Sequence, residues 1–180
     1  MDDITLDRLR YPIGKFKVPP KINGNHLKEW IAVLEHFPKR LEDLVSALSD
    51  AQLDSAYRPG GWTVRQLVHH ISDSHHNCYT RIKWALTEHN PEIKAYDEKL
   101  WAELFDSRTA PIQMSLDHLR AVHAKLVHLA KGLSEEDLKR KLTHPVGRVE
   151  SSLEEQLGRY AWHSVHHYTH IENFLKREGN

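Results

Sequence analysis

The chain has 180 residues, and its 25 Lys and Arg residues balance 25 Asp and Glu residues, so the formal charge is zero with histidine neutral. This length predicts one domain with a sizeable core. The charge balance argues against a nucleic-acid partner, which would require a basic face. The single cysteine, Cys78, excludes an internal disulfide and a cysteine-rich zinc site, and it suits a reducing compartment.

The N-terminus lacks the basic-then-apolar pattern of a secretory signal, and no apolar run approaches the about 20 residues that a membrane span needs. We therefore expect a soluble, cytoplasmic protein with no membrane partner. The 15 histidines are a large excess for this length, and they gather in two places rather than in a terminal tag.

Residues 1–24 contain three prolines and two glycines, which predicts an extended arm lying on the surface. Residues 25–180 are expected to form a single helical bundle domain. Its first helix should begin near Asn25, which is a good N-cap residue. The apolar pattern of this helix continues in phase across Pro38, which predicts one kinked helix rather than two.

A second helix is predicted from Thr63 to Thr87, with Thr63 as its cap. One of its faces is an apolar stripe that includes His75. A second, polar row runs along the same helix and consists of His70, Ser74, Asn77 and Arg81. Such a row is usually a solvated face, but short side chains around a histidine also suit the wall of a pocket.

Residues 88–110 look irregular apart from a turn of helix within 96–104. A third helix is predicted from Pro111 to Lys131, with Met114 among its inward residues and Gly132 ending it. Residues 143–149 suggest a small hairpin. The segment Ser151-Ser-Leu-Glu154 is a capping-box pattern that should open the last helix, which ends near residue 179.

A faint internal repeat relates residues 47–53 to residues 131–138. Each segment follows a long helix and is followed by a loop and then by a histidine-bearing helix. The sequence therefore predicts an all-α four-helix bundle that brings its second and fourth helices together, and bundle cores are a recurrent place for metal sites.

The last predicted helix carries four histidines, at positions 163, 166, 167 and 170. Residues four apart lie about 5–6 Å apart on one helical face, so His163/His167 and His166/His170 are both possible ligand pairs. Helical phase places His167 and His163 beside the apolar face and turns His166 well away, with His170 between. The first pair is therefore preferred, and an ordinary hydrogen-bonded histidine is the alternative for each.

The second histidine cluster, on the second predicted helix, consists of His69, His70, His75 and His76. One ligand from this helix and two from the last helix would make a three-histidine site. Structural zinc sites use four protein ligands, whereas catalytic sites often use three and keep a position open for water. The pattern therefore favours the catalytic kind.

Three segments, 57–71, 91–104 and 160–167, resemble the YfiT-like metal-dependent hydrolases of the DinB-like superfamily, which also includes bacillithiol S-transferases. The likeness extends to residues 11–14. It implies a four-helix bundle, a cytoplasmic homodimer and one divalent metal ion per chain. The ligands that it implies are His70, His163 and His167. Helical phase instead puts His75 on the most apolar side of its helix, so His75 remains the alternative to His70 and is otherwise a core residue or a neighbour of the ligands.

Zinc is the expected ion and nickel the second choice, because imidazole suits both. Such an ion can lower the pKa of water toward about 7, or bind and deprotonate a thiol. The resemblance makes hydrolysis of a small-molecule substrate the expected function. Thiol S-transfer, with Arg81 holding a carboxylate, and a non-catalytic metal-binding bundle remain open. No catalytic residue is assigned, and the candidates for a general base are Asp73, Asp97, Glu98 and Glu172.

Overall fold

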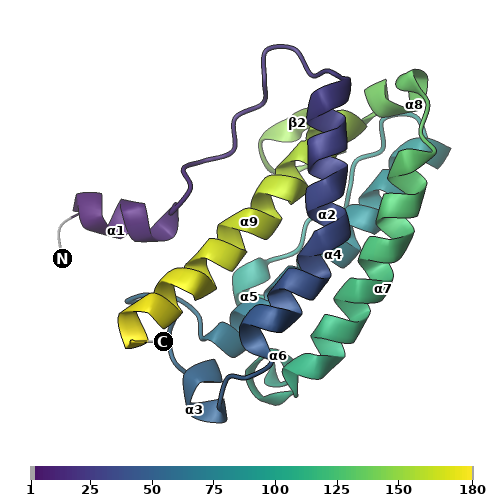
Figure 1. The fold of residues 1–180 in the computed structure, drawn as a ribbon. Helices are drawn as coiled ribbons and strands as arrows, with labels where there is room; N and C mark the ends of the chain where they lie inside the picture. Colours follow the sequence, from purple (N-terminus) through teal and green to yellow (C-terminus); the bar gives the residue numbers. More distant parts are fainter. Residues whose placement is uncertain (1–2, 180) are drawn as a thin grey trace.

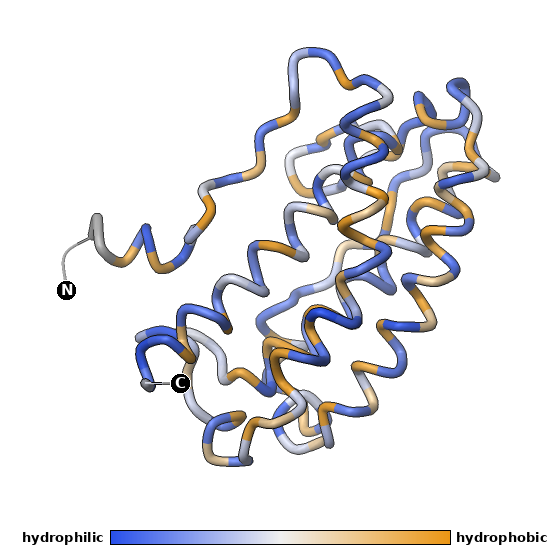
Figure 2. Tube along the Cα trace, viewed as in Figure 1, coloured by the Kyte–Doolittle hydropathy of each residue, from blue (hydrophilic) through white to orange (hydrophobic). Residues whose placement is uncertain are grey.

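The computed structural model describes residues 3–179 and confirms the all-α four-helix bundle. The long helices are α2 (Gly24–Val45), α4 (Val64–Thr87), α7 (Ile112–Lys131) and α9 (Leu153–Glu178). They lie side by side along one axis (Figure 1). Figure 2 shows apolar positions recurring along each of them, as expected for helices that bury one face. None of the described helices is long and apolar enough to cross a bilayer.

The helices pair in an order that requires long connections. α2 and α9 run in one direction and α4 and α7 in the other (Figure 1), while α4 packs on both α7 and α9. The neighbours α4 and α7 are thus parallel, and no short turn can join them. Residues 88–111 instead return along the bundle and form α5 (Glu98–Ala102) and α6 (Phe105–Thr109). The helical turn predicted within 96–104 is α5, whereas α6 lies in a stretch that was expected to be irregular.

The two segments of the internal repeat form equivalent short helices. α3 (Asp50–Leu53) follows α2 and is capped by Ser49, and α8 (Glu135–Lys139) follows α7 and is capped by Ser134. In both helices, the serine side chain accepts a hydrogen bond from the backbone N–H of the third helical residue. Each serine thus pairs one of the N–H groups that the N-terminus of a helix leaves without a partner. The repeat therefore reflects two connections built on one plan.

The predicted hairpin is present and is longer than expected. β1 (Lys141–His144) and β2 (Val149–Ser152) pair antiparallel, with Lys141 opposite Ser152. The short 3₁₀ helix η1 (Val146–Arg148) joins them. Gly147 lies in this turn with φ of 74°, a left-handed conformation that glycine adopts without steric cost.

Two helix starts differ by a residue or two from those predicted. Asn23, and not Asn25, caps α2, and its Oδ1 accepts hydrogen bonds from the N–H groups of the second and third helical residues. The capping box of α9 is formed by Ser152 and Glu155. Ser151 lies one residue earlier, within β2, and its Oγ instead accepts a hydrogen bond from Nε2 of Gln156.

Two further expectations are corrected. Met114 is 66% exposed, because it stands two residues, or about 200° of helical rotation, from the first buried residue of α7, Leu116. The N-terminal arm is not extended throughout, since Asp3–Arg10 forms α1. The basic residues Arg8 and Arg10 in its last turn favour that helix, and Pro12 limits its continuation.

The apolar core consists of two separate clusters, one toward each end of the bundle. Each long helix contributes to both clusters: α4, for example, gives Ile71 to one and Cys78 to the other. Between these two positions lies His75, and equivalent positions of α7 and α9 also hold histidines. A layer of buried and half-buried histidines thus divides the core, and we call it the histidine layer. The residues that form it are His75, His123, His163, His167 and His170.

The close approach of α2 and α9 gives a test of the packing. A Cβ atom added at Gly158 would lie 2.9 Å from the Trp30 ring. Overpacking costs about 1–3 kcal/mol and the gain in helix propensity is about 1 kcal/mol, so we expect Gly158→Ala to lower the free energy of unfolding by about 1 kcal/mol. Denaturant unfolding measures this change in the free energy of unfolding. The same change at Gly132, where an added Cβ meets nothing closer than 3.6 Å, should cost less. A stabilised Gly158→Ala protein would contradict the close contact.

Candidate metal centre

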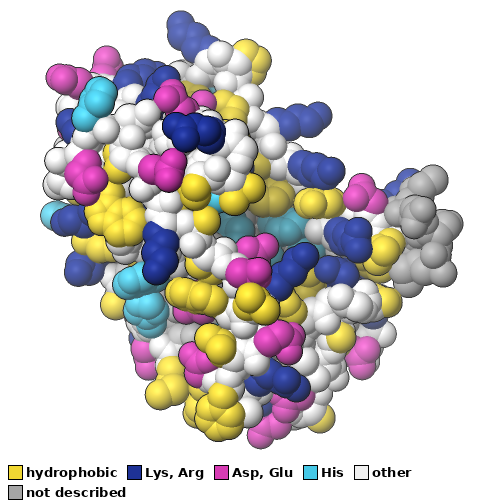
Figure 3. All heavy atoms as spheres, turned by 180° about the vertical axis from the view of Figure 1, so that it is seen from behind, with side chains coloured by type: hydrophobic (Ala, Val, Ile, Leu, Met, Phe, Trp, Pro, Cys, Tyr) yellow, Lys and Arg dark blue, Asp and Glu magenta, His cyan; other side chains and the backbone are white. Residues whose placement is uncertain are grey.

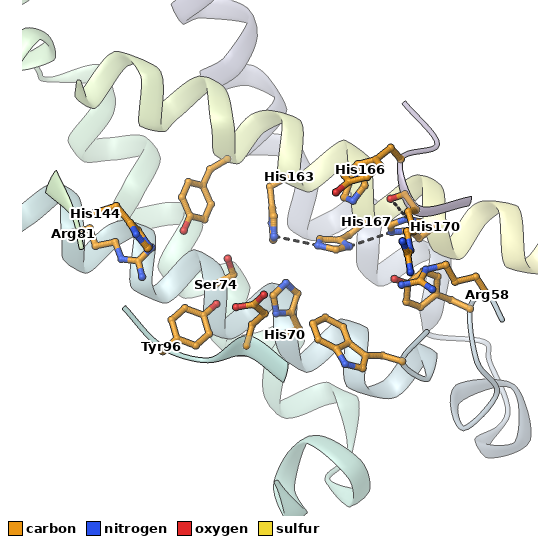
Figure 4. Close-up of a pocket in the computed structure, with 16 residues that line it drawn as sticks. Arg58, His70, Ser74, Arg81, Tyr96, His144, His163, His166, His167 and His170 are labelled. Atoms are coloured by element: carbon orange, nitrogen blue, oxygen red, sulfur yellow. Dashed lines mark hydrogen bonds between the residues drawn. The ribbon is translucent and has the colours of Figure 1, made fainter. Parts of the chain in front are cut away.

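The structure brings together the three histidines that the sequence singled out as ligands. His70 lies on α4, and His163 and His167 lie one turn apart on α9 (Figure 4). One ring nitrogen from each residue lies within 4.8 Å of the others. The ring centroids are 5.4 Å apart for His70 and His163, 5.1 Å for His70 and His167, and 4.4 Å for His163 and His167. Three imidazoles from two facing helices therefore converge on one small volume.

A chain of hydrogen bonds leads to His163 from the opposite side of the bundle. It starts at the backbone carbonyl of Leu34 on α2, which lies 2.6 Å from Nδ1 of His123 on α7. Nε2 of His123 lies 2.8 Å from Nδ1 of His75 on α4. Nε2 of His75 then lies 3.1 Å from Nδ1 of His163 on α9. All four long helices contribute one group to this chain, which we call the inner relay.

The carbonyl at its start fixes the direction of every bond in the inner relay. A carbonyl oxygen only accepts, so Nδ1–H of His123 donates to Leu34 and its Nε2 is left to accept. A neutral imidazole has one donor and one acceptor nitrogen. Nδ1–H of His75 therefore donates to His123, and Nδ1–H of His163 donates to His75. The relay leaves the Nε2 lone pair of His163 free.

A second, shorter chain fixes His167 in the same way. Nε2 of His170 lies 3.1 Å from the carbonyl oxygen of Leu9 and 3.2 Å from that of Arg10, so it carries the proton and donates. Nδ1 of His170 must then accept, and it lies 3.3 Å from Nδ1 of His167. Nδ1–H of His167 is the donor, so its Nε2 lone pair is also free. We call this chain, anchored in the N-terminal arm, the outer relay.

The two relays end on two lone pairs that face each other. Nε2 of His163 and Nε2 of His167 are 3.1 Å apart, and neither carries a proton that could be shared. Two nitrogen ligands at about 2.0–2.1 Å from a tetrahedral zinc ion lie roughly 3.3 Å apart. The separation, the free lone pairs and the nearby imidazole of His70 thus fit one divalent ion held by Nε2 of His163, Nε2 of His167 and one nitrogen of His70.

The electrostatics of the site keep these imidazoles uncharged. Burial lowers the pKa of His70 to about 4. Burial, with the neighbouring histidines, holds the pKa values of His163 and His167 well below their ordinary value. Metal ligation requires neutral imidazole, so all three side chains are in the correct protonation state at neutral pH.

The expectation that His166 and His170 turn away from the site is wrong. Both are buried, and both line the same cavity as the other three histidines. The N-terminal arm covers this face of α9: the Tyr11 ring lies 6.0 Å from that of His166, and the carbonyl of Gly14 accepts a hydrogen bond from Nε1 of Trp162. A face that one helix by itself would expose is therefore buried by a segment distant in sequence.

A second group, formed by His166, His167 and His170, also places three nitrogens within 4.8 Å. It would have to use the other nitrogen of His167, because Nε2 points to His163. That nitrogen, Nδ1, is the donor in the outer relay, and His170 is committed to the same bond. The hydrogen bonds therefore favour the first group. Among the described residues, Nδ1 of His166 is buried without a hydrogen-bond partner.

The histidines lie at the floor of a cavity of about 430 Å³, visible as histidine surface in a hollow in Figure 3. His70, Ser74 and Arg81 of the predicted polar row line it, whereas Asn77 instead donates to the backbone carbonyl of Asp73. The sequence reasoning missed the remaining wall, because nothing local places loop residues beside the histidines. These residues come from the arm, the loop before α4, the crossover and β1: Arg10, Tyr11, Tyr57, Arg58, Trp62, Tyr96 and His144.

The candidate bases occupy different places. Glu98 lines the cavity. Asp97 caps α5, and Glu172 pairs with Lys176. Asp73 does not line the cavity, although burial and the nearby Asp106 raise its pKa to about 6. Of the four, Glu98 alone is placed to meet a substrate beside the histidines.

The inner relay predicts a loss of metal affinity from a residue that is not itself a ligand. We expect His75→Phe to weaken zinc binding by about 10–100-fold, the usual effect of removing the hydrogen-bond partner of a ligand. Phenylalanine fills the space between Phe37 and His123 but cannot accept from Nδ1–H of His163. A zinc titration against a competing chelator measures the affinity. His69→Phe is the control, since His69 is also a buried histidine of α4 but bonds to Ser115 and Ala110. Equal losses in both variants would contradict the relay.

The histidine layer also predicts acid sensitivity of the metal-free protein. Burial lowers the pKa of His123 from 6.5 to about 4, so below pH 6.5 the unfolded chain binds more protons and stability falls as the pH drops toward 4. His123 alone contributes on the order of 3 kcal/mol. The raised pKa of Asp73 acts in the opposite sense but is one group among many. Urea unfolding from pH 7 to pH 4 measures the slope, and His123→Phe should flatten it. A wild-type free energy of unfolding that stays constant from pH 7 to pH 4 would contradict the conclusion that the histidine layer is uncharged.

Comparison with known proteins gives matches along nearly the whole chain. Residues 34–171, which include all three converging histidines, match the DinB superfamily. YfiT of Bacillus subtilis, named as a candidate metal-dependent hydrolase, is 45% identical over 176 residues, or 98% of this chain and 99% of the relative. OB0782 of Oceanobacillus iheyensis, named in the same way, is 45% identical over 170 residues, or 94% and 97% of the two chains.

Solved structures give the same result. The structure of YfiT from Bacillus subtilis, described as "a probable metal-dependent hydrolase with an unusual four-helix bundle topology", superposes with a TM-score of 0.94 at 45% identity and covers 96% of this chain and 98% of that chain. The four-helix bundle protein TT2238 gives a TM-score of 0.55 at 18% identity, over 81% and 98% of the two chains, and supports the fold alone. On the match to residues 34–171 and the 45% identity over nearly the whole length, the chain belongs to the DinB superfamily.

Proposed function

We propose that this protein is a metal-dependent hydrolase that holds one divalent ion, zinc or nickel, on His70, His163 and His167. The observation that carries the proposal is the pair of Nε2 lone pairs that face each other at 3.1 Å at the ends of the two relays. The relatives named as candidate metal-dependent hydrolases support the reaction class. An ion bound there would lower the pKa of water toward about 7 and so supply a nucleophile at neutral pH.

The residues of the chain supply the remaining functions of the site. The two relays hold the His163 and His167 rings in the tautomer and orientation that present Nε2, as hydrogen-bonded partners of metal ligands commonly do. Three neutral ligands leave the charge of the ion uncompensated, which favours an anionic or polarised substrate group. Glu98 is the only carboxylate among the described residues that line the cavity. We propose it as the proton acceptor.

The proposal is tested by metal content and hydrolysis together. We expect His70→Ala, His163→Ala and His167→Ala each to lose the ion, because each removes one of three protein ligands, and to lose hydrolysis of a panel of small esters and amides. Elemental analysis of untagged protein and the rate above a zinc-only blank measure the two effects. His118→Ala, which changes a histidine outside the cavity, is the matched control and should keep both.

Several outcomes separate the alternatives. A folded wild-type protein that takes up neither zinc nor nickel would refute the metal site. A metal-loaded protein that hydrolyses nothing above the blank, but consumes thiol in the presence of an electrophile, would instead indicate thiol S-transfer. Circular dichroism after chelation should keep its helical signal, because both apolar cores are independent of the ion. Loss of that signal would show the ion to be structural.

A further inference from the structure

A buried arginine stands at one end of the cavity, away from the three converging histidines. Arg81 is 9% exposed and lines the cavity from α4 (Figure 4). Its guanidinium makes one long hydrogen bond, from Nη2 to the carbonyl of Lys94 at 3.4 Å, and lies 5.8 Å from the centroid of the Tyr96 ring. Among the described residues its Nε is buried with no hydrogen-bond partner, and no carboxylate lies within 4 Å.

The other buried arginine of α4, Arg65, has its positive charge balanced by neighbouring carboxylates. Arg65 is 7% exposed, and its Nε and Nη2 each donate at 2.7 Å to the carboxylates of Asp54 and Asp50. Its Nη1 donates to the carbonyl of Ala110. A buried charge without such partners is costly. The chain thus compensates one buried arginine of α4 with two carboxylates and leaves the other facing the cavity without any.

Neutral hydrogen-bond donors lie in the same cavity as Arg81. Ser74, Tyr96 and Tyr160 line it, and Ser74 and Tyr96 lie between Arg81 and His70 in Figure 4. Burial raises the pKa of both tyrosines, so their hydroxyl groups stay protonated at neutral pH. A planar guanidinium with several nearby hydroxyl groups matches the oxygens of a carboxylate or phosphate group. Among residues 3–179, Glu98 is the acidic side chain that lines this cavity, and it makes no ion pair with Arg81.

We propose that Arg81 is the anchor of a substrate oxyanion, a carboxylate or a phosphate group, that lies at a distance from the reacting group held at the histidines. This inference rests on the proposed metal-dependent function, because it assigns the second contact of the same substrate. Arg81 lies 11 residues, or about 16 Å of helix rise, from His70 on α4. The substrate is therefore a small acid whose reacting group and charged group are separated by a spacer.

An adjoining cavity gives such a substrate further room. It has a volume of about 370 Å³ and shares Arg81, His144 and Tyr160 with the first cavity. Its remaining wall is partly apolar and includes Ile93, Leu142 and Val149. Arg81 thus stands at the junction of the two spaces. An acid anchored there can extend toward the histidines on one side and place an apolar substituent on the other.

The test uses the zinc-loaded protein and probes with a thiol at one end. A series of ω-mercaptocarboxylates of increasing length is compared with ω-mercaptoalcohols of the same length, because the thiol binds zinc in both and only the acid can meet Arg81. Calorimetry measures the dissociation constants. We expect the acid to bind about tenfold or more tightly than the alcohol at one optimal length, as a charge-assisted hydrogen-bonded pair provides. A matching mercaptophosphonate series shows which oxyanion fits better.

The variants separate the anchor from general electrostatics. Arg81→Gln should abolish the advantage of the acid and leave thiol binding and zinc content unchanged. Lys83→Ala removes the same charge from an exposed position of α4 and should keep the advantage. Equal binding of acid and alcohol at every length, with thiol binding intact, would overturn the anchor and leave the metal site standing. Absence of zinc and of thiol binding in the wild-type protein would overturn both. Arg10 and Arg58 also line the cavity, so a variant of Arg81 is needed to assign the contact. If Arg81→Gln fails to fold, Arg81→Lys replaces it: this variant keeps the charge but loses the planar fork, and it should reduce the advantage of the acid. An unchanged advantage would overturn the anchor.

Discussion

The structure depends on keeping a layer of imidazoles neutral and hydrogen-bonded in the middle of a bundle. Each of these rings has one donor and one acceptor, and at the fully buried His75 and His123 no solvent can pair with a group that the protein leaves unmatched. A buried polar group without a partner costs about 1–3 kcal/mol. The inner relay meets this demand with one group from each long helix, so the relative placement of α2, α4, α7 and α9 is tied to a single directional chain. Within the histidine layer, the two nitrogen lone pairs that receive no hydrogen bond are Nε2 of His163 and Nε2 of His167, and they face each other.

The unusual order of the helices serves the same site. Because α4 and α7 are parallel neighbours, the chain must travel back along the bundle between them, and this crossover brings Tyr96 and Glu98 to the cavity. The loop between α3 and α4 contributes Arg58, and the hairpin between α8 and α9 contributes His144. The bundle therefore supplies the rigid floor and the connections supply the walls. This division is common where specificity differs among proteins that share a fold.

The sequence predicted the parts of this structure that depend on local or repeated signals. Periodicity placed the long helices within a residue or two, and the four-residue spacing of His163 and His167 put them on one face. The resemblance, and not periodicity, selected His70 over His75, and the structure places His70 with the other two while His75 becomes their hydrogen-bonded neighbour. That these three hold a metal ion stays a prediction.

What the sequence could not predict depends on contacts between distant segments. Helical phase describes how one helix faces its neighbours, so it could not show that the N-terminal arm would cover His166 and His170. His123 gave no signal either, since a single histidine on a bundle helix has no local partner. Its role follows only from the carbonyl of Leu34, which lies on the opposite side of the core.

The distribution of the relay groups along the chain has a consequence for biosynthesis. The anchoring carbonyls belong to Leu9, Arg10 and Leu34, which leave the ribosome early, whereas two of the three converging histidines lie on α9, the last helix to be made. During translation, the earlier helices expose His70, His75 and His123 without the rings that they meet in the finished fold. The nascent chain therefore cannot assemble the site before α9 docks. In this fold, the three histidines converge only when the bundle is complete.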